Sequence, residues 1–251
     1  MVGPAPASPA FDDYLGLLRQ IHEHLRPATY VEIGVHEGAS LALVGPGTRS
    51  VGIDPAPTVR HPLQPNTTVL QQTSDAAFAG DELSRLLEGR PVALAFIDGL
   101  HLFECALRDF IALERRCTPS STVLVHDCYP RDEVTSARER TTVFWSGDVW
   151  KLVLCLVEFR PDLRVAVADV APTGVAIIRG LDPASDVLSA RYDDLCARFI
   201  GLGYDAVSED KAGRLRLVPC DWPTVRDLLA AGEAAAGDCV SDTLAVSNRC
   251  L

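Results

Sequence analysis

Short apolar runs that alternate with helical stretches constrain the fold of this chain more than any other feature. The runs YVEIG, SVGID, TTVLQQ, VALAFID and STVLVHD follow one another between residues 30 and 127. Segments of helical periodicity separate them: ASLALV after the first run, FAGDELSRLLEG after the third and LFECALRDFIALERR after the fourth. Largely apolar strands that alternate with helices are typical of a doubly wound parallel α/β sheet.

A different connection follows in the second half of the chain. The helical segment DVWKLVLCLVEF precedes two further strand-like runs, LRVAVADV and TGVAIIRGL. Only Ala171 and Pro172 separate these runs, which is too short for a parallel crossover, so we expect an antiparallel hairpin. The sequence therefore predicts a Rossmann-like sheet that is mostly parallel and has a reversed last strand.

Segments on both sides of this core have helical patterns of their own. Apolar residues recur at helical spacing from Asp12 to Arg26, which predicts an N-terminal helix. Beyond residue 182 we expect a helix near Tyr192 to Ile200, a strand at RLRLV and an Ala-rich helix near Val225 to Ala236. A chain of 251 residues suits one core with appendages. We divide it into an N-terminal lead and helix (1–28), a core (29–181) and a C-terminal extension packed on that core (182–251).

Composition excludes several classes of partner. A net charge of −11 and a pI near 4.9 argue against nucleic acid, which needs a basic surface. No apolar run approaches the eighteen or so residues of a membrane span. The start MVGPAPASPAFDD does not resemble a signal peptide, so we expect a cytoplasmic protein. The cysteines are scattered without a C-x-x-C pair, which favours reduced thiols.

The loop after the first strand carries the sharpest motif, Tyr30-Val-Glu-Ile-Gly-Val-His-Glu-Gly-Ala-Ser-Leu41. A dinucleotide site would need a glycine in the middle of this turn, but Val35 and His36 stand there. The acidic Glu32 would repel a pyrophosphate and suits the positive amino or sulfonium end of S-adenosylmethionine. The residues predicted to bind the cofactor in this loop are Glu32, Gly34, His36, Gly38 and Ser40.

Two further acids follow at the ends of the next strands. Asp54 ends the second strand, where a carboxylate accepts hydrogen bonds from ribose hydroxyls. Ser74 and Asp75 follow the third strand, beside the expected position of the adenine. Each signal is weak alone, but together and in this order they favour an adenosyl ligand.

This order of motifs resembles the class I S-adenosylmethionine-dependent methyltransferases over roughly Thr29 to Leu181. The terminal hairpin is similar to the reversed last strand of that fold. Within it, VALAFIDGLHLFECALRDF and STVLVHDCYP resemble the branch of macrocin-type O-methyltransferases and cephalosporin-hydroxylase-like proteins. The resemblance implies that the acids after strands four and five, Asp98 and Asp127, bind a divalent cation such as Mg²⁺.

Elementary electrostatics supports a cation at this place. Carboxylates at the ends of neighbouring strands repel each other, and a cation relieves the repulsion. The residues beside Asp127 are His126 and Cys128, which favour softer ions. Adjacent residues of a strand point to opposite faces, so His126 joins Asp127 as a ligand only where the strand has ended.

His101 is the predicted general base, because it follows Asp98 by three residues at a turn into a helix. His126 is the substitute. Asp98 completes the predicted catalytic group and is also among the residues predicted to bind the cofactor. A purely structural role of His101, as a helix cap or at the sheet edge, stays open. Tyr129 and Trp145 are expected in a lid over the substrate, and Trp150 is expected to pack inside.

The sequence thus favours methyl transfer to a hydroxyl, less readily an amine, of a small metabolite in natural-product biosynthesis. A repurposed or non-catalytic member of the fold, which serves as a partner subunit or performs a different reaction, remains an alternative. A nicotinamide-dependent oxidoreductase is a weaker one. A homo-oligomer is compatible with the sequence, which identifies neither the oligomeric state nor the methyl acceptor.

Overall fold

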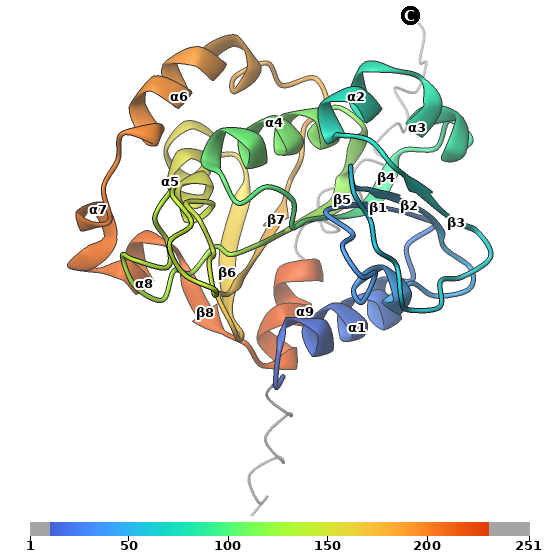
Figure 1. Ribbon diagram of the computed structural model, residues 1–251, viewed down its shortest axis with the longest axis horizontal. Coiled ribbons are helices and arrows are strands. Elements are labelled where there is room, and N and C mark those ends of the chain that lie inside the picture. The colour runs from blue at the N-terminus through green and yellow to red at the C-terminus, as the bar shows by residue number, and fades with distance from the viewer. Residues whose placement is uncertain (1–10, 231–251) are drawn as a thin grey trace, which may run out of the picture.

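The computed structural model describes residues 11–230. Its strands are β1 (Thr29–Ile33), β2 (Arg49–Ile53), β3 (Thr67–Leu70), β4 (Val92–Ile97), β5 (Cys117–His126), β6 (Arg164–Asp169), β7 (Val175–Arg179) and β8 (Leu217–Pro219). They form one sheet in the order β3-β2-β1-β4-β5-β7-β6-β8 (Figure 1). The first five strands are parallel, β7 is antiparallel to both of its neighbours, and β8 pairs in parallel with β6. This topology confirms the predicted Rossmann-like sheet with its antiparallel hairpin.

Helices cover both faces of the sheet. They are α1 (Tyr14–Leu25), α2 (Ser74–Ala79), α3 (Glu82–Leu86), α4 (Phe103–Glu114), α5 (Trp150–Phe159), α6 (Tyr192–Ile200), α7 (Asp205–Ser208), α8 (Lys211–Arg214) and α9 (Trp222–Ala230), with 3₁₀ turns η1 (Leu41–Leu43) and η2 (Ser189–Arg191). In Figure 1, α1 and α9 lie below the sheet and α2 to α6 lie above it. Each layer encloses its own hydrophobic core.

α1 forms where the sequence predicted a helix, and its ends explain its length. The side chain of Asp13 caps the first turn by accepting a hydrogen bond from the amide of Gly16 at 2.9 Å. Leu17, Leu18 and Ile21 are buried against the sheet. Arg26 adopts a left-handed conformation before Pro27 and ends the helix. The helix thereby places its first residues beside the ends of the central strands.

The structure differs from the sequence prediction at two helices. The segment ASLALV, predicted as a helix, contains only the single 3₁₀ turn η1. The preceding loop uses left-handed conformations at Gly34, His36 and Gly38, so too few residues remain before Pro46 for a longer helix. The segment FAGDELSRLLEG is divided at Gly80 into the two short helices α2 and α3.

The other elements agree with the sequence patterns. α6 covers the predicted segment, and β8 overlaps the end of RLRLV and extends one residue further, to Pro219. β5 begins earlier than predicted, and its register against β4 shifts near Val92. The Ala-rich helix is described as α9, and its predicted part from 231 to 236 lies outside the described residues.

Two expectations from composition can be compared with residues 11–230. No helix in this range is long and apolar enough to cross a membrane. The cysteines within the range are free thiols.

Trp150 is fully buried, as predicted.

Candidate active site

The predicted functional residues gather at the carboxyl ends of β1, β4 and β5, where ligands bind in open α/β sheets. Gly34, directly after β1, is essential to this arrangement. Its φ is +89°, and a Cβ at this position would collide with the carbonyl oxygen of Asp98. The loops after β1 and β4 are therefore in backbone contact, so residues from both loops face the same space.

Glu32 lies at the end of β1 and is fully buried. Its carboxylate accepts hydrogen bonds from the hydroxyl of Tyr30 at 2.6 Å and from that of Ser40 at 2.7 Å. Burial raises the pKa of Glu32 to about 8, against the opposing effect of these two hydroxyls. Within residues 11–230, Glu32 thus has hydroxyl partners and no positively charged partner. A nearby cationic ligand group would stabilise its carboxylate.

Asp54, after β2, organises the loop that follows β1. One of its oxygens accepts hydrogen bonds from the amides of Val35 at 2.9 Å and His36 at 2.8 Å, and the other from the amide of Ala56 at 2.7 Å. The residues after Asp54 pack on the same loop, with Val59 next to Gly38. The predicted ribose-binding acid is therefore tied to the glycine loop, and it also fixes the left-handed turn at His36.

The predicted adenine contacts have partners on α4 in this structure. Asp75 is exposed and forms an ion pair with Arg108 at 3.1 Å. Ser74 hydrogen-bonds Asp109, a buried acid whose pKa is raised to about 6, mainly by burial. Asp109 also lies close to Gly99. Sequence reasoning did not single out Asp109, because an acid inside an apolar helix gives no local signal of a site.

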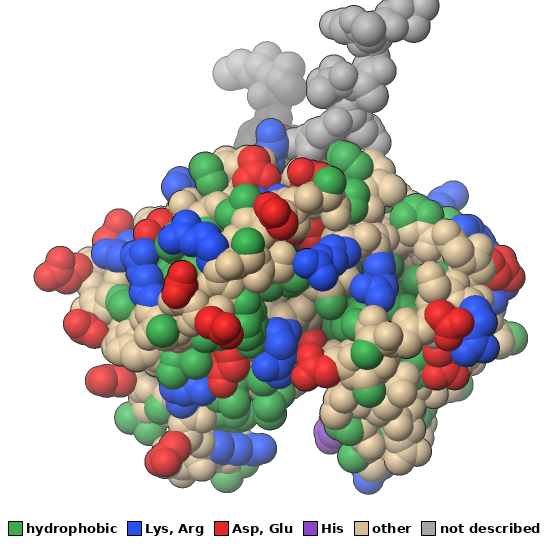
Figure 2. Space-filling model, turned by 90° about the horizontal axis from the view of Figure 1, so that it is seen from above, with side chains coloured by type: hydrophobic (Ala, Val, Ile, Leu, Met, Phe, Trp, Pro, Cys, Tyr) green, Lys and Arg blue, Asp and Glu red, His purple; other side chains and the backbone are tan. Residues whose placement is uncertain are grey.

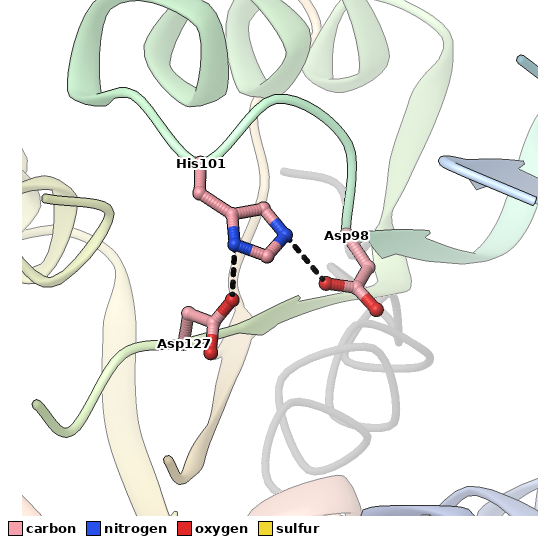
Figure 3. A group of neighbouring side chains, drawn as sticks. All are labelled: Asp98, His101 and Asp127. Carbon is pink, nitrogen blue, oxygen red and sulfur yellow. Dashed lines mark ion pairs between the residues drawn. The ribbon is translucent and has the colours of Figure 1, made fainter. Parts of the chain in front are cut away.

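Asp98, His101 and Asp127 form the centre of the site (Figure 3). Each offers a ligand atom, and these atoms all lie within 4.8 Å of one another. The imidazole of His101 lies between the carboxylates, with Nδ1 3.0 Å from Asp127 and Nε2 3.5 Å from Asp98. The structure thus brings together the two predicted cation ligands and the predicted base.

His126 joins this group from a different side. β5 ends at His126, and Asp127 has a φ of +61°, which turns the chain at the point where the strand alternation stops. Nδ1 of His126 lies 3.1 Å from Asp98 and 3.7 Å from Asp127. Its Nε2 is buried without a partner in the described structure. His126 therefore faces the acids, but it is outside the set of three whose ligand atoms lie mutually close.

The close packing of these charges shifts their pKa values. Burial alone would lower the pKa of His101, but Asp98 and Asp127 outweigh it and raise the pKa to about 9. The pKa of His126 is raised in the same way, chiefly by Asp98. His126 and His101 lower the pKa of Asp98 despite its burial, whereas burial raises that of Asp127. His101 thus differs from the near-neutral imidazole that the sequence suggested, because it holds its proton at pH 7.

His101 is held in place by the segment that follows β5. Its Nδ1 also lies 3.1 Å from the carbonyl of Trp145, and the two rings stack at 5.4 Å. The amide of Asp148 donates to the carbonyl of His101 at 3.1 Å. A Cβ on Gly147 would collide with that same carbonyl. Trp145 thus contacts the predicted base, which agrees with its expected place over the site.

Asp148 anchors this segment on α4. Its carboxylate accepts hydrogen bonds from the amide of Phe103 at 2.8 Å, from Arg138 at 2.8 Å and from Lys151 at 2.9 Å. Arg138 in turn forms two hydrogen bonds to Glu104, at 2.7 and 2.9 Å. The polar segment from 130 to 149 is therefore fixed by a charge network that the sequence pattern did not reveal.

Seen from above, the molecule has a deep notch in one side (Figure 2). It divides the part that carries α6 to α8 from the part that carries β2 and β3, and a histidine side chain lies on one wall. Apolar side chains are exposed on the loops after β4 and β5, among them Leu100, Val134 and Val143.

Comparison with known proteins agrees with this geometry. Residues 31–128 match a family model described as a methyltransferase domain. A search of curated proteins found no match. Among solved structures, a putative O-methyltransferase from Klebsiella pneumoniae aligns with 11% identity and a TM-score of 0.50 over 70% of this chain and 84% of that one. A methyltransferase from Podospora anserina, solved with S-adenosylhomocysteine bound, aligns with 13% identity and a TM-score of 0.50 over 67% of this chain and 78% of that one.

Proposed function

We propose that this chain, whose residues 31–128 match a methyltransferase domain on a class I fold, transfers a methyl group from S-adenosylmethionine to a hydroxyl of a small molecule. The observation that carries the proposal is the group of Asp98, His101 and Asp127 beside the glycine loop of β1. A buried acid without a positive partner, Glu32, stands next to that loop and suits a sulfonium ligand. The nicotinamide alternative receives no comparable support.

The proposed reaction is a direct displacement. The acceptor oxygen forms a bond to the methyl carbon, the carbon–sulfur bond breaks, and its electron pair remains on sulfur. The hydroxyl proton passes to a base. Because the reaction needs no covalent intermediate with the protein, alignment of the oxygen, the methyl carbon and the sulfur supplies most of the rate enhancement. The loop after β1, at Gly34, and the loop after β4, at Asp98, are in backbone contact. This contact holds the residues of the two loops at fixed positions relative to each other and so supports the alignment.

His101 is the proposed base, with His126 as the second candidate. His101 lies in the site with its ring fixed by Trp145 and by two carboxylates. An imidazole accepts a proton only in its neutral form, so His101 must first release the proton that Asp98 and Asp127 stabilise. A change that draws these carboxylates away from His101 would allow this release.

A divalent cation fits the same residues. Asp98 and Asp127 offer carboxylate oxygens, and His101 offers a ring nitrogen when it is neutral and not serving as the base. Oδ2 of Asp127 is buried and has no hydrogen bond in the described structure besides its ion pair with His101. Such a mixed set of oxygen and nitrogen ligands suits Mg²⁺ or Mn²⁺ and also softer ions. When bound, the ion would position the acceptor oxygen and lower its pKa.

Apolar side chains on the loops around the site support a small, partly apolar acceptor, as in natural-product biosynthesis. Leu100 and Val143 expose apolar surface on the loops around the site, and Trp145 stacks on the proposed base. The acidic chain disfavours a nucleic-acid acceptor.

The decisive test is titration calorimetry of the purified chain with S-adenosylhomocysteine and with Mn²⁺. We expect both to bind. Asp98→Asn and Asp127→Asn should each lower Mn²⁺ affinity at least tenfold, since each removes a charged ligand. Asp193→Asn on the exposed start of α6 is the matched control and should change nothing.

Failure of S-adenosylhomocysteine to bind would refute the methyltransferase proposal. Binding that persists together with full product formation in Asp98→Asn, Asp127→Asn and His101→Ala would instead refute the catalytic assignments. Binding without any methyl transfer to a panel of phenols and sugars would favour the repurposed member of the fold.

A further inference from the structure

Tyr14, the first residue of α1, lies against the site although no motif includes it. Its ring centroid is 4.3 Å from that of His126 and stacks 6.2 Å from that of Phe96 on β4. Its amide donates to the carbonyl of Ala171 at 2.9 Å. Ala171 belongs to the β6–β7 turn, which also contains Thr173, the partner of Asp127 at 2.5 Å. The same turn therefore fixes Tyr14 and Asp127.

The hydroxyl of Tyr14 has no hydrogen-bond partner in the described part of the chain, whereas the neighbouring hydroxyls are used. Those of Tyr30 and Ser40 donate to Glu32, and that of Thr173 donates to Asp127. The ring of Tyr14 is only partly buried. Its hydroxyl is therefore an unused donor on a partly exposed side chain.

Acidic groups surround this hydroxyl. Burial raises the pKa of Tyr14 above its usual range, and the charges of Asp98, Glu32, Asp13 and Asp127 raise it further. A phenol with its ordinary pKa of about 10 is already protonated at neutral pH, so the hydroxyl has a hydrogen to donate. The histidine that packs on Tyr14 is less accessible, because Nδ1 of His126 faces Asp98 and its unpaired Nε2 is buried.

This environment matches one end of S-adenosylmethionine in particular. The methionine part carries an ammonium group and a carboxylate on the same carbon. The acids at the ends of β1, β4 and β5 attract the ammonium group, but they repel the carboxylate. A carboxylate held beside these acids needs a neutral donor, and a phenol hydroxyl supplies a hydrogen bond without a competing charge.

We propose that the hydroxyl of Tyr14 donates a hydrogen bond to the α-carboxylate of the methionine part of bound S-adenosylmethionine. The inference rests on the proposed function and adds α1 to the cofactor site. Tyr14 is then a binding residue that distinguishes the intact amino-acid end from shortened analogues. It also explains why the N-terminal helix starts at the edge of the site and not elsewhere on the sheet.

The test compares two ligands that differ only in the carboxylate, S-adenosylhomocysteine and its decarboxylated analogue, S-adenosyl-3-thiopropylamine. Tyr14→Phe keeps the ring on His126 and removes only the hydroxyl. We expect the variant to bind S-adenosylhomocysteine about tenfold more weakly, the usual effect of losing a hydrogen bond to a charged group, and the analogue as tightly as the unmodified chain does. Tyr204→Phe, whose ring packs on Trp150, is the control and should leave both affinities unchanged.

Equal affinity of Tyr14→Phe and the unmodified chain for S-adenosylhomocysteine would overturn the inference. An equal loss for both ligands would overturn it too, because it would show a structural effect of the substitution. If the unmodified chain binds neither ligand, the proposed function fails and the inference fails with it. That outcome differs from the first two, in which the unmodified chain does bind.

Discussion

His22 is a buried histidine that takes no part in the site. Its ring packs edge-on against Tyr30, and neither of its nitrogens has a hydrogen-bond partner in the described structure. Burial lowers its pKa to about 4. The unfolded chain therefore takes up a proton at His22 near pH 6.5, while the folded chain resists protonation down to about pH 4.

This difference predicts how stability changes with pH. The contribution of neutral His22 is complete above pH 6.5 and is lost as the pH falls toward 4, by up to about 3 kcal/mol. His22→Leu removes the titrating group and should weaken this decline in stability. His61→Leu replaces an exposed histidine, serves as the control and should leave the decline unchanged. Urea unfolding at pH 7 and pH 4.5 checks this. The same pH dependence in His22→Leu and the unmodified chain would contradict the assignment.

Sequence reasoning identified individual residues where strand ends determine their neighbours. The convergence of Asp98, His101, His126 and Asp127 followed from adjacent parallel strands, and the structure brings them together. The partners that fix them could not be predicted. Thr173 reaches Asp127 from 46 positions away, because the hairpin turn folds back on β5. Contacts of this kind depend on tertiary packing and leave no local pattern.

At the scale of elements, the conformation of the segment from 130 to 149 is determined mainly by its contacts with other elements. It is polar and contains no regular helix or strand, yet Asp148 fastens it to the start of α4 and to buried Lys151. Arg138 connects it further to Glu104. Because the network depends on one shared carboxylate, we expect its loss to loosen the whole segment.

Asp148→Asn tests that expectation. Removing a buried charge shared by two cations should cost about 3 kcal/mol of folding free energy. The affinity for S-adenosylhomocysteine should change less than twofold, because Asp148 lies outside the loops of β1 and β2. Denaturant unfolding and calorimetry measure the two quantities. A large loss of ligand affinity at unchanged stability would contradict the structural role.

Helices were predicted correctly where the apolar periodicity extends over a long segment. The prediction failed where the conformation of a preceding loop determines whether a helix can form. α4, α5 and α6 follow their patterns closely. The stretch ASLALV has helical periodicity, but the loop after β1 contains left-handed residues and leaves too few residues before Pro46 for a full helix. A single sequence does not reveal such positive φ values at a non-glycine residue such as His36.

At the scale of the whole molecule, the C-terminal extension belongs to the same folded unit as the core. β8 is the edge strand of the single sheet, and Leu195, Phe199 and Leu215 lie in the core that also contains residues of β4 and α4. Residues 182–230 therefore pack on the core, and the division of the chain at 181 and 182 stays a prediction.

A single cooperative unfolding transition is expected for this reason, with equal calorimetric and van't Hoff enthalpies. A chain that ends at residue 181 should be strongly destabilised, since it exposes the surface that α6 and β8 cover. Scanning calorimetry of both chains checks the prediction. Two separate transitions in the full chain, or an unchanged melting temperature after truncation, would show an independent domain.

Under the proposed function, the contact between Gly147 and the carbonyl of His101 bears on how the acceptor of such a protein can change during evolution. The crowded end of the segment tolerates no added atom, whereas Val134 and Val143 farther along are exposed. New side chains can accumulate in the exposed stretch without moving Gly147 and His101, which lie at the proposed site. The segment thus separates variation in acceptor choice from preservation of the chemistry, and laboratory diversification of specificity is best confined to residues 131–144.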